Sequence, residues 1–393
     1  MTEGEDSSSS PSEWSEAEEA PPDKTPTWEG TAGGNIKGVD PHNLKYKFGD
    51  IKSNPGTFRG RILSGDRFVN PGTVPGKWGR VMELGQLVNG TPVTEFILLG
   101  FGVGQQERFL LLAFFAILYM VTLAENLTII TLVVLDTHLS RHPMYILLGN
   151  FSWLEICLVS TTVPRMIFDL ASPQGIISFR DCFLQFYLLF SLGTSEDLFL
   201  SAMALDRYVA ICHPLRYPQI MSQDFCYALV VACWGLGFTA YVVPVTMMSR
   251  LSFCGPNIID HFLCDAEPIL SLVCPPLGVA PLVCQVLANA LILSNVLFVV
   301  LSYGTVILTL MKPAFEGSRK KAFSTISFHL IVVTFYYGSV AAIYICPDGE
   351  NQAEVTKAVT LFCTSIAPFF NPMIYCLRND QVKEALGRLR RNV

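Results

Sequence analysis

Two glutamates, Glu155 and Glu196, each stand inside a long apolar stretch of this 393-residue chain. A bare charge in such surroundings is costly, so acids there are candidates for function. Two carboxylates that lie close together repel each other, and the pair therefore shares a proton or recruits a cation. General acid–base catalysis is the rival interpretation, because hydrolases use paired carboxylates. We favour an ion- or proton-coupled role, since intramembrane acids usually mark ion or proton sites.

The triplet Asp206-Arg207-Tyr208 stands at the end of the apolar stretch that contains Glu196. A guanidinium at that place needs a carboxylate, backbone carbonyls or water as partners. An interfacial arginine that snorkels to lipid headgroups is the simpler interpretation. The functional interpretation is that the arginine belongs to a switch that holds one conformation of the protein.

Asn371-Pro372 stands inside the last apolar stretch, with Tyr375 one helical turn further along. Proline removes a backbone hydrogen bond and kinks a helix, and a kink is a natural place for a two-state element. A purely structural kink is the alternative.

Seven apolar stretches must position these residues. Each has about twenty or more mostly apolar residues, enough helix to cross a hydrocarbon core of about 30 Å. The stretches are continuous rather than alternating, which favours helices over a barrel. The sequence therefore predicts an all-α membrane protein, a seven-transmembrane helix bundle over residues 109–377, with spans at 109–135, 143–170, 182–207, 225–249, 281–311, 321–345 and 357–377.

Lysine and arginine predict the orientation of the bundle. Twelve of them fall in the first, third and fifth loops and the C-terminus, whereas the other loops hold Arg180 and Arg250, with Arg165 and Lys357 at span edges. The basic side faces the cytoplasm, so we expect the N-terminus outside and the C-terminus inside. Asn89-Gly90-Thr91 then lies outside, as a predicted N-glycosylation site at Asn89.

Four of the twelve cysteines fall on the predicted outer side, where disulfides persist. Four cysteines allow three pairings, and their spacing does not choose among them. A metal site is the alternative, but paired Cys-x-x-Cys spacing is missing from the sequence. The four are Cys182, Cys254, Cys264 and Cys274.

The N-terminal part differs in composition from the rest of the chain. Hydrophobic residues make up 51% of the whole sequence, yet residues 1–50 hold eleven acidic and four basic residues and a serine run. Such a segment cannot bury enough apolar surface to fold, so we expect disorder. The net charge of −6 reflects this tail and indicates no nucleic-acid partner. The acidic start of the chain lacks the basic and apolar segments of a signal peptide, so we expect none.

We therefore expect a disordered acidic and Gly/Pro-rich extension over 1–81, and an extracellular N-terminus over 82–108. The seven-helix bundle of 109–377 follows, and then a cytoplasmic tail over 378–393 whose basic and apolar spacing predicts a short amphipathic helix on the inner leaflet. The extension is interpreted as an upstream gene-model segment or an alternative form, with a real disordered ectodomain as the alternative.

From about Leu84 to its end, the chain resembles an olfactory receptor, a rhodopsin-like G-protein-coupled receptor. Six motifs carry the resemblance in order, and the loop from Phe253 to Cys264 also looks like the family's. The motifs are Thr94-Glu-Phe-Ile-Leu-Leu-Gly-Phe101, Pro143-Met-Tyr145, Met203-Ala-Leu-Asp-Arg-Tyr-Val-Ala-Ile-Cys-His-Pro214, Ser302-Tyr303, Lys321-Ala-Phe-Ser-Thr325 and Pro368-Phe-Phe-Asn-Pro-Met-Ile-Tyr-Cys-Leu-Arg-Asn379.

The resemblance implies roles for several of these residues. It pairs Cys182 with Cys264, and Cys254 with Cys274. It implies that Arg207, flanked by Asp206 and Tyr208, holds the resting state and then contacts a heterotrimeric G protein, while Tyr303 and Tyr375 swing inward on activation. It places a structural sodium ion, and no other cofactor, near Glu155 and Glu196.

The resemblance also implies a plasma-membrane receptor for a small, mostly apolar, volatile odorant, signalling through cyclic AMP. Position Leu189 offers no salt bridge to a cationic amine. The pocket is expected in the outer half of the bundle, lined by Leu189, Phe190, Gly193, Thr194, Leu287, Ala288, Leu291, Tyr337, Val340, Ala341 and Tyr344.

Three positions depart from the family pattern. Glu125 adds an acid where glycine is usual, and Ile326 and Phe328 replace a cysteine and a small residue near the G-protein face, so packing and coupling efficiency are affected there. A transporter or channel is the competing class, but the sequence shows no repeat between its halves. An intramembrane hydrolase that uses Glu155 and Glu196 is the third function hypothesis.

Overall fold

The computed structural model describes residues 44–45, 62–64, 67–69, 93–172, 175–254, 256–275, 277–313, 319–345, 352–377 and 380–392. The chain divides into two units, Met1–Asn70 and Pro71–Val393. We describe each unit by itself.

The first unit contains three short strands: β1 (Leu44–Lys45), β2 (Ile62–Ser64) and β3 (Arg67–Val69). They form an antiparallel sheet in the order β1-β2-β3, with Leu63 opposite Phe68. No regular structure is expected from the sequence over residues 1–81, and these three short strands correct that expectation.

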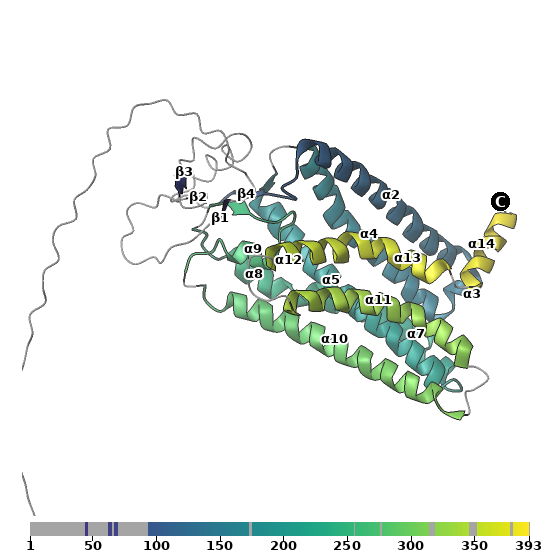
Figure 1. The fold of residues 1–393 in the computed structure, drawn as a ribbon. Coiled ribbons are helices and arrows are strands. Elements are labelled where there is room, and N and C mark those ends of the chain that lie inside the picture. The colour runs from purple at the N-terminus through teal and green to yellow at the C-terminus, as the bar shows by residue number, and fades with distance from the viewer. Residues whose placement is uncertain are drawn as a thin grey trace, which may run out of the picture. The chain divides into compact units, whose positions relative to one another are not determined.

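The second unit is built from long helices that lie side by side (Figure 1). All seven predicted apolar stretches are helical in the described residues. Their elements are α2 (Gln105–Leu135), α4 (Pro143–Ala171), α5 (Phe179–Cys212), α7 (Gln223–Ala240) with α8 (Val242–Ser249), α10 (Ala280–Leu310), α11 (Arg319–Ile345), and finally α12 (Gln352–Leu361), the π-helical turn η5 (Phe362–Ile366) and α13 (Ala367–Leu377).

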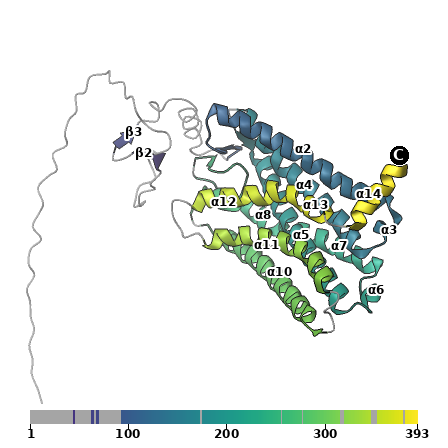
Figure 2. The same cartoon turned by 45° about the vertical axis from the view of Figure 1, so that its right-hand side comes forward.

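Shorter helices complete this unit. The turned view in Figure 2 shows α3, α6 and α14 gathered at one end of the long helices. Their bounds are α3 (Thr137–Ser140), α6 (Tyr217–Ile220) and α14 (Asp380–Asn392), and α9 (Ala266–Leu270) lies in the loop before α10.

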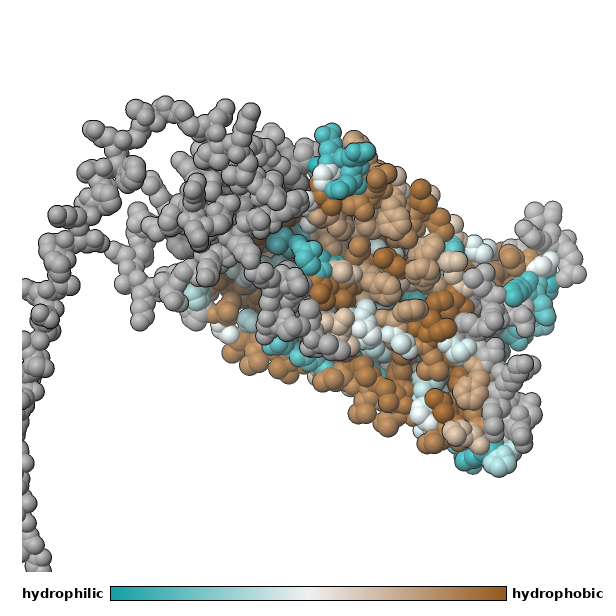
Figure 3. Space-filling view, viewed as in Figure 1, coloured by the Kyte–Doolittle hydropathy of each residue, from teal (hydrophilic) through white to brown (hydrophobic). Residues whose placement is uncertain are grey.

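Among the residues that the structure describes, five helical segments are long and apolar enough to cross a membrane: α2, α4, α5, α7 with α8, and α10. Helix α11 carries a shorter apolar section, His329–Ala342, and the last segment divides into three elements. Apolar side chains cover the flanks of the long helices in the face shown in Figure 3. Large exposed apolar residues such as Phe109, Ile117 and Leu308 are what a lipid-facing surface requires.

Helices α4 and α5 form the centre of the bundle. In each, 67% of the most apolar eighteen-residue window is buried, against 22% for α2 and 28% for α10. The approach of α7 to α5 depends on Gly237, because a Cβ atom there would lie 2.0 Å from Ser195 Oγ and 2.8 Å from the Ser191 carbonyl. Small residues let membrane helices approach this closely.

Proline explains the break in the fourth segment. Pro244 has no N–H to donate to the carbonyl of Ala240, and α7 ends at Ala240.

Two prolines in the last segment each release a carbonyl that side chains of other helices satisfy. Pro368 has no N–H for the Thr364 carbonyl, which accepts instead from Thr162 Oγ1 of α4 at 3.2 Å. Pro372 likewise releases the Pro368 carbonyl, which accepts from Asn126 Nδ2 of α2 at 3.5 Å. The π-helical turn η5 immediately precedes this pair of prolines. Partners from neighbouring helices are what allows proline inside a spanning helix.

A small sheet caps the end of the bundle at which α5 begins. Strand β4 (Glu95–Leu98) pairs antiparallel with β5 (Ile176–Ser178) and parallel with β6 (Ile258–Ile259). Phe96 is fully buried and its ring contacts those of Phe179 and Phe253. Gly175 permits the crossing, because a Cβ atom there would lie 2.4 Å from the Leu98 carbonyl and its φ is +59°.

Candidate functional site

Asp206 and Arg207 lie at the end of α5, far along the helix from Cys182 near its start. Arg207 Nε donates to Asp206 Oδ2 at 2.9 Å, and its Nη2 forms a shorter contact with the same oxygen. The other carboxylate oxygen, Oδ1, accepts from the Tyr217 hydroxyl of α6 at 2.8 Å. The Asp206 side chain is 1% exposed, so this set of partners holds a buried ion pair at the end of the bundle.

Two further side chains lie beside this ion pair. The Tyr303 hydroxyl of α10 hydrogen-bonds His329 Nδ1 of α11, and both rings lie close enough to Arg207 to interact electrostatically. Burial raises the pKa of Tyr217, and the adjacent Asp206 carboxylate raises it further, so the phenol stays a donor. Tyr208 points elsewhere, since its hydroxyl contacts His213 Nε2 at 3.3 Å.

The terminal helix α14 is tied to the loop after α2. Arg388 contacts Asp136 Oδ2 through Nε at 2.9 Å and Nη2 at 2.7 Å. Burial alone would raise the pKa of Asp136, but the bonds from Arg388 and from the His138 and Leu139 amides hold it below its ordinary value. Val382 and Ala385 are the buried side of α14 among its described side chains.

A second polar cluster lies in the middle of the bundle. Asn371 Nδ2 of α13 donates to Glu155 Oε1 of α4 at 2.5 Å, and Glu196 of α5 lies near enough to Glu155 for their charges to interact. Both glutamates are almost fully buried. The structure therefore brings together the two acids and the Asn371-Pro372 motif that the sequence analysis singled out separately.

The donor set of this cluster fits a small monovalent cation. Within the described residues, Glu155 Oε2 and Glu196 Oε1 are buried oxygens without a hydrogen-bond partner. In that same part of the chain, no three acidic, histidine or cysteine side chains gather closely enough to hold a metal ion by themselves. A cation here would need amide or hydroxyl oxygens besides the two carboxylates.

The predicted pocket residues lie on α5, α10 and α11. Leu189 and Thr194 are buried and Phe190 and Gly193 half-buried, and the Tyr336 hydroxyl reaches the Gly193 carbonyl at 3.5 Å. Phe190 packs on the ring of Tyr241, centroids 5.3 Å apart. The half-buried members on the other two helices are Leu287, Ala288, Leu291, Tyr337, Val340 and Ala341.

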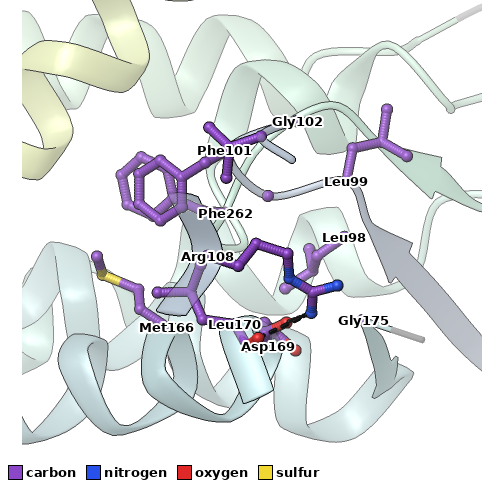
Figure 4. Close-up of a pocket in the computed structure, with 12 residues that line it drawn as sticks. Leu98, Leu99, Phe101, Gly102, Arg108, Met166, Asp169, Leu170, Gly175 and Phe262 are labelled. Atoms are coloured by element: carbon purple, nitrogen blue, oxygen red, sulfur yellow. Dashed lines mark hydrogen bonds between the residues drawn. The ribbon is translucent and has the colours of Figure 1, made fainter. Parts of the chain in front are cut away.

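A cavity of about 170 Å³ lies elsewhere, at the capped end between β4, α2 and α4. Figure 4 shows Arg108 reaching across it toward Asp169, with Phe101 and Phe262 stacked on one side. Arg108 Nη2 donates to the carbonyls of Asp169, Leu170 and Ser172, at 3.0, 2.8 and 2.8 Å. These bonds close the C-terminal end of α4, so we interpret Arg108 as structural. None of the predicted pocket residues lines this cavity.

The described part of the chain contains two disulfides, Cys182–Cys264 and Cys254–Cys274, the pairing that the family resemblance implies. The first ties the loop before α10 to α5, and Gln185 Oε1 fixes the same loop by accepting from the Cys264 amide at 3.1 Å. Asn89 lies outside the described residues, as do the side chains of Tyr344, Tyr375 and Phe328. Ile326 is fully buried, and Glu125 is half-buried with Oε2 unpartnered among the described residues.

Sequence reasoning missed several partners that complete these clusters. Tyr217 and His329 adjoin Arg207, Thr162 satisfies a carbonyl released by proline, and Asp197 lies beside Tyr336 and Tyr337. The prolines did carry a usable signal, because each identifies the carbonyl four residues before it as needing a partner. Which side chain supplies that partner depends on how the helices pack.

Comparison with known proteins gives a consistent match over the bundle. A family model described as olfactory receptor matches residues 115–391. Human olfactory receptor 11G2 is 48% identical over 300 residues, which cover 76% of this chain and 87% of that protein. Human olfactory receptor 11H6 is 46% identical over 297 residues, covering 76% and 90% respectively. Human olfactory receptor 6B1 is 41% identical over 304 residues, covering 77% and 97%.

Proposed function

The chain belongs to the olfactory receptor family, and on this premise we propose that it binds small, mostly apolar odorants within its helix bundle and activates a heterotrimeric G protein that raises cyclic AMP. The match over residues 115–391 is the observation that carries the proposal. It makes the chain a multi-pass membrane receptor rather than an enzyme. Hydrolysis by Glu155 and Glu196 and a transport role are accordingly set aside.

In this proposal the protein lies in the plasma membrane with the disulfides outside and Arg207 at the cytoplasmic face. Disulfides persist in oxidising surroundings, and lysine and arginine accumulate in cytoplasmic loops. Cys182 and Arg207 stand near opposite ends of α5, about 37 Å apart at 1.5 Å per residue. The two independent rules thus agree on one orientation, which supports an extracellular N-terminus and an α14 at the inner leaflet.

Signalling in this proposal is a shift between two arrangements of the Arg207 end. The resting arrangement holds Arg207 on Asp206, with Tyr217 as the second partner of that carboxylate. An odorant that binds the other arrangement more tightly shifts the population toward it. Arg207 then becomes available to the G protein, with Tyr303, Asn371, Pro372 and Tyr375 as the moving parts of α10 and α13.

The test of the function is cyclic AMP in cells that express the full chain with an olfactory-type G protein. A broad odorant panel should contain compounds that raise cyclic AMP in a dose-dependent manner, while cells lacking the receptor stay flat. A panel that evokes no rise, although antibody staining shows the protein at the surface, would contradict the proposal.

We further propose that a sodium ion occupies the cluster at Glu155 and Glu196. The unpartnered buried carboxylate oxygens support this, since a cation would compensate charges that lack hydrogen bonds. Replacing sodium by choline should lower the thermal unfolding temperature of the purified receptor, and Glu196→Gln should abolish the difference. Equal unfolding temperatures in the two salts would rule the ion out.

A further inference from the structure

Asp197 is a second buried acid in the middle of α5, directly after Glu196 in the chain. Glu196 interacts with Glu155, whereas Asp197 lies next to the phenol hydroxyls of Tyr336 and Tyr337 on α11. Asp197 is only 3% exposed. Adjacent residues on a helix point about 100° apart, so the two neighbouring carboxylates leave α5 in different directions, although their charges still act on each other.

Asp197 and Tyr337 each keep a polar atom without a proper partner. Within the described residues, Asp197 Oδ1 and the Tyr337 hydroxyl are buried and form no hydrogen bond of acceptable geometry. Leaving such groups unsatisfied is costly, and each case in a native protein calls for an explanation. A bound group that donates to the carboxylate would satisfy it.

Space for such a group lies one helical turn before Asp197. Gly193 precedes it by four residues on α5, and a Cβ atom added to Gly193 would meet nothing within 4 Å. Gly193 is one of the predicted pocket positions, and so is Tyr337. The open position at Gly193 and the unpartnered atoms below it therefore belong to the same part of the bundle.

We propose that Asp197, together with Tyr337, forms a polar floor of the ligand pocket and selects odorants whose apolar body ends in a hydrogen-bond donor, a primary amine or an alcohol. This inference rests on the proposed function and specifies the ligand class of the same site. Leu189 offers nothing to a donor, but Asp197 lies eight residues deeper, about 12 Å along α5. A straight, slender molecule would reach it with its polar end first.

The next turn of α5 offers a structural alternative. Ser201 Oγ donates to Asn295 Oδ1 of α10 at 2.6 Å, and Ser201 also interacts with Tyr337. If Asp197 only extended this link between helices, its replacement would change folding or basal activity equally for every ligand. Discrimination among ligands therefore separates the two roles.

The experiment uses the full chain in cells with the cyclic AMP readout, and straight-chain amines, alcohols and aldehydes of matched length from butyl to decyl. Amines and alcohols should be more potent than the matched aldehydes, which only accept hydrogen bonds. Asp197→Asn should weaken the amines by about tenfold or more, because a charge-assisted bond is lost. The amide oxygen still accepts from an alcohol, so alcohols should weaken less and aldehydes should not change.

Glu125→Gln is the matched control, since it neutralises a half-buried acid on α2 without changing this floor. Should Asp197→Asn fail to reach the surface, Tyr337→Phe, which removes only a hydroxyl, should reduce the preference for donors in the same direction. Equal potency of the three compound classes, or equal weakening of all of them in the variants, would overturn the inference while leaving the receptor function intact. Silence toward every odorant would instead overturn the proposed function, and this inference with it.

Discussion

Tyr217 is the side chain through which the short helix α6 acts on the ion pair at the end of α5. Its hydroxyl is a hydrogen-bond donor to Asp206, and without it the carboxylate loses one of two buried partners. Tyr217→Phe should therefore loosen the resting arrangement by about 1 kcal/mol, a several-fold rise in the active population. Basal cyclic AMP per surface receptor measures this effect.

The control for that variant is Tyr208→Phe, whose lost hydroxyl contacts His213 rather than Asp206. Basal activity that is the same in the two variants, or lower in Tyr217→Phe than in the unaltered receptor, would show that Tyr217 does not restrain Arg207.

His261 should make the loop before α10 sensitive to acid. Its Nδ1 accepts from the Leu263 amide at 3.1 Å, and burial lowers its pKa, with Asp265 and Asp260 opposing and Lys357 assisting. A base whose pKa is lowered by folding takes up its proton first in the unfolded chain, so stability falls as the pH drops below the ordinary value of 6.5. The thermal unfolding temperature of the purified receptor should decrease from pH 7.5 toward pH 5 (an acid window of roughly this width follows from the linkage relation).

In His261→Asn this part of the pH dependence should disappear, whereas His138→Asn, in the short helix α3, should retain it. An unchanged slope in His261→Asn would locate the acid sensitivity elsewhere.

At the scale of elements, the last helical segment depends on partners from α4 and α2. The Thr162 hydroxyl lies 3.2 Å from both the Thr364 carbonyl and the Leu158 carbonyl of its own helix. Thr162→Val removes the donor that Pro368 cannot replace at Thr364, and should cost about 1 kcal/mol. A lower unfolding temperature in detergent is the expected result. The neighbouring Thr161→Val is a matched control, because the Thr161 hydroxyl bonds only within its own helix, to the Cys157 carbonyl. Equal losses in the two variants would contradict this role of Thr162.

The same segment shows where sequence reasoning reached its limit. Apolar length predicted all seven helical stretches, because lipid requires each span to satisfy its own backbone. It did not predict the break at Tyr241 or the π-helical turn at Phe362–Ile366, which arise where prolines disturb a helix that neighbours then support. The strands β4, β5 and β6 were also missed, since their pairing joins segments far apart in the chain.

The candidate sites follow the same division. Residue types identified Glu155, Glu196, Arg207 and Asn371, because charged and amide groups are rare inside apolar stretches. Spacing left three cysteine pairings open, and the family resemblance supplied the pairing that the structure contains. The sequence alone gave no interpretation of Asp197. Tyr336 and Tyr337 lie beside it only because of how the helices pack, and the sequence of one helix does not determine which neighbours its side chains contact.

At the scale of the whole molecule, the account is that of a bundle whose outer half binds an odorant and whose Arg207 end drives nucleotide exchange. The most direct test is odorant-stimulated exchange of GTP on a purified heterotrimeric G protein, catalysed by the full chain in lipid nanodiscs, with Arg207→Ala in parallel. We predict that an odorant accelerates exchange by the unaltered receptor and not by Arg207→Ala. An acceleration that survives in the variant at equal receptor density, or none in either protein while the odorant binds, would contradict the account.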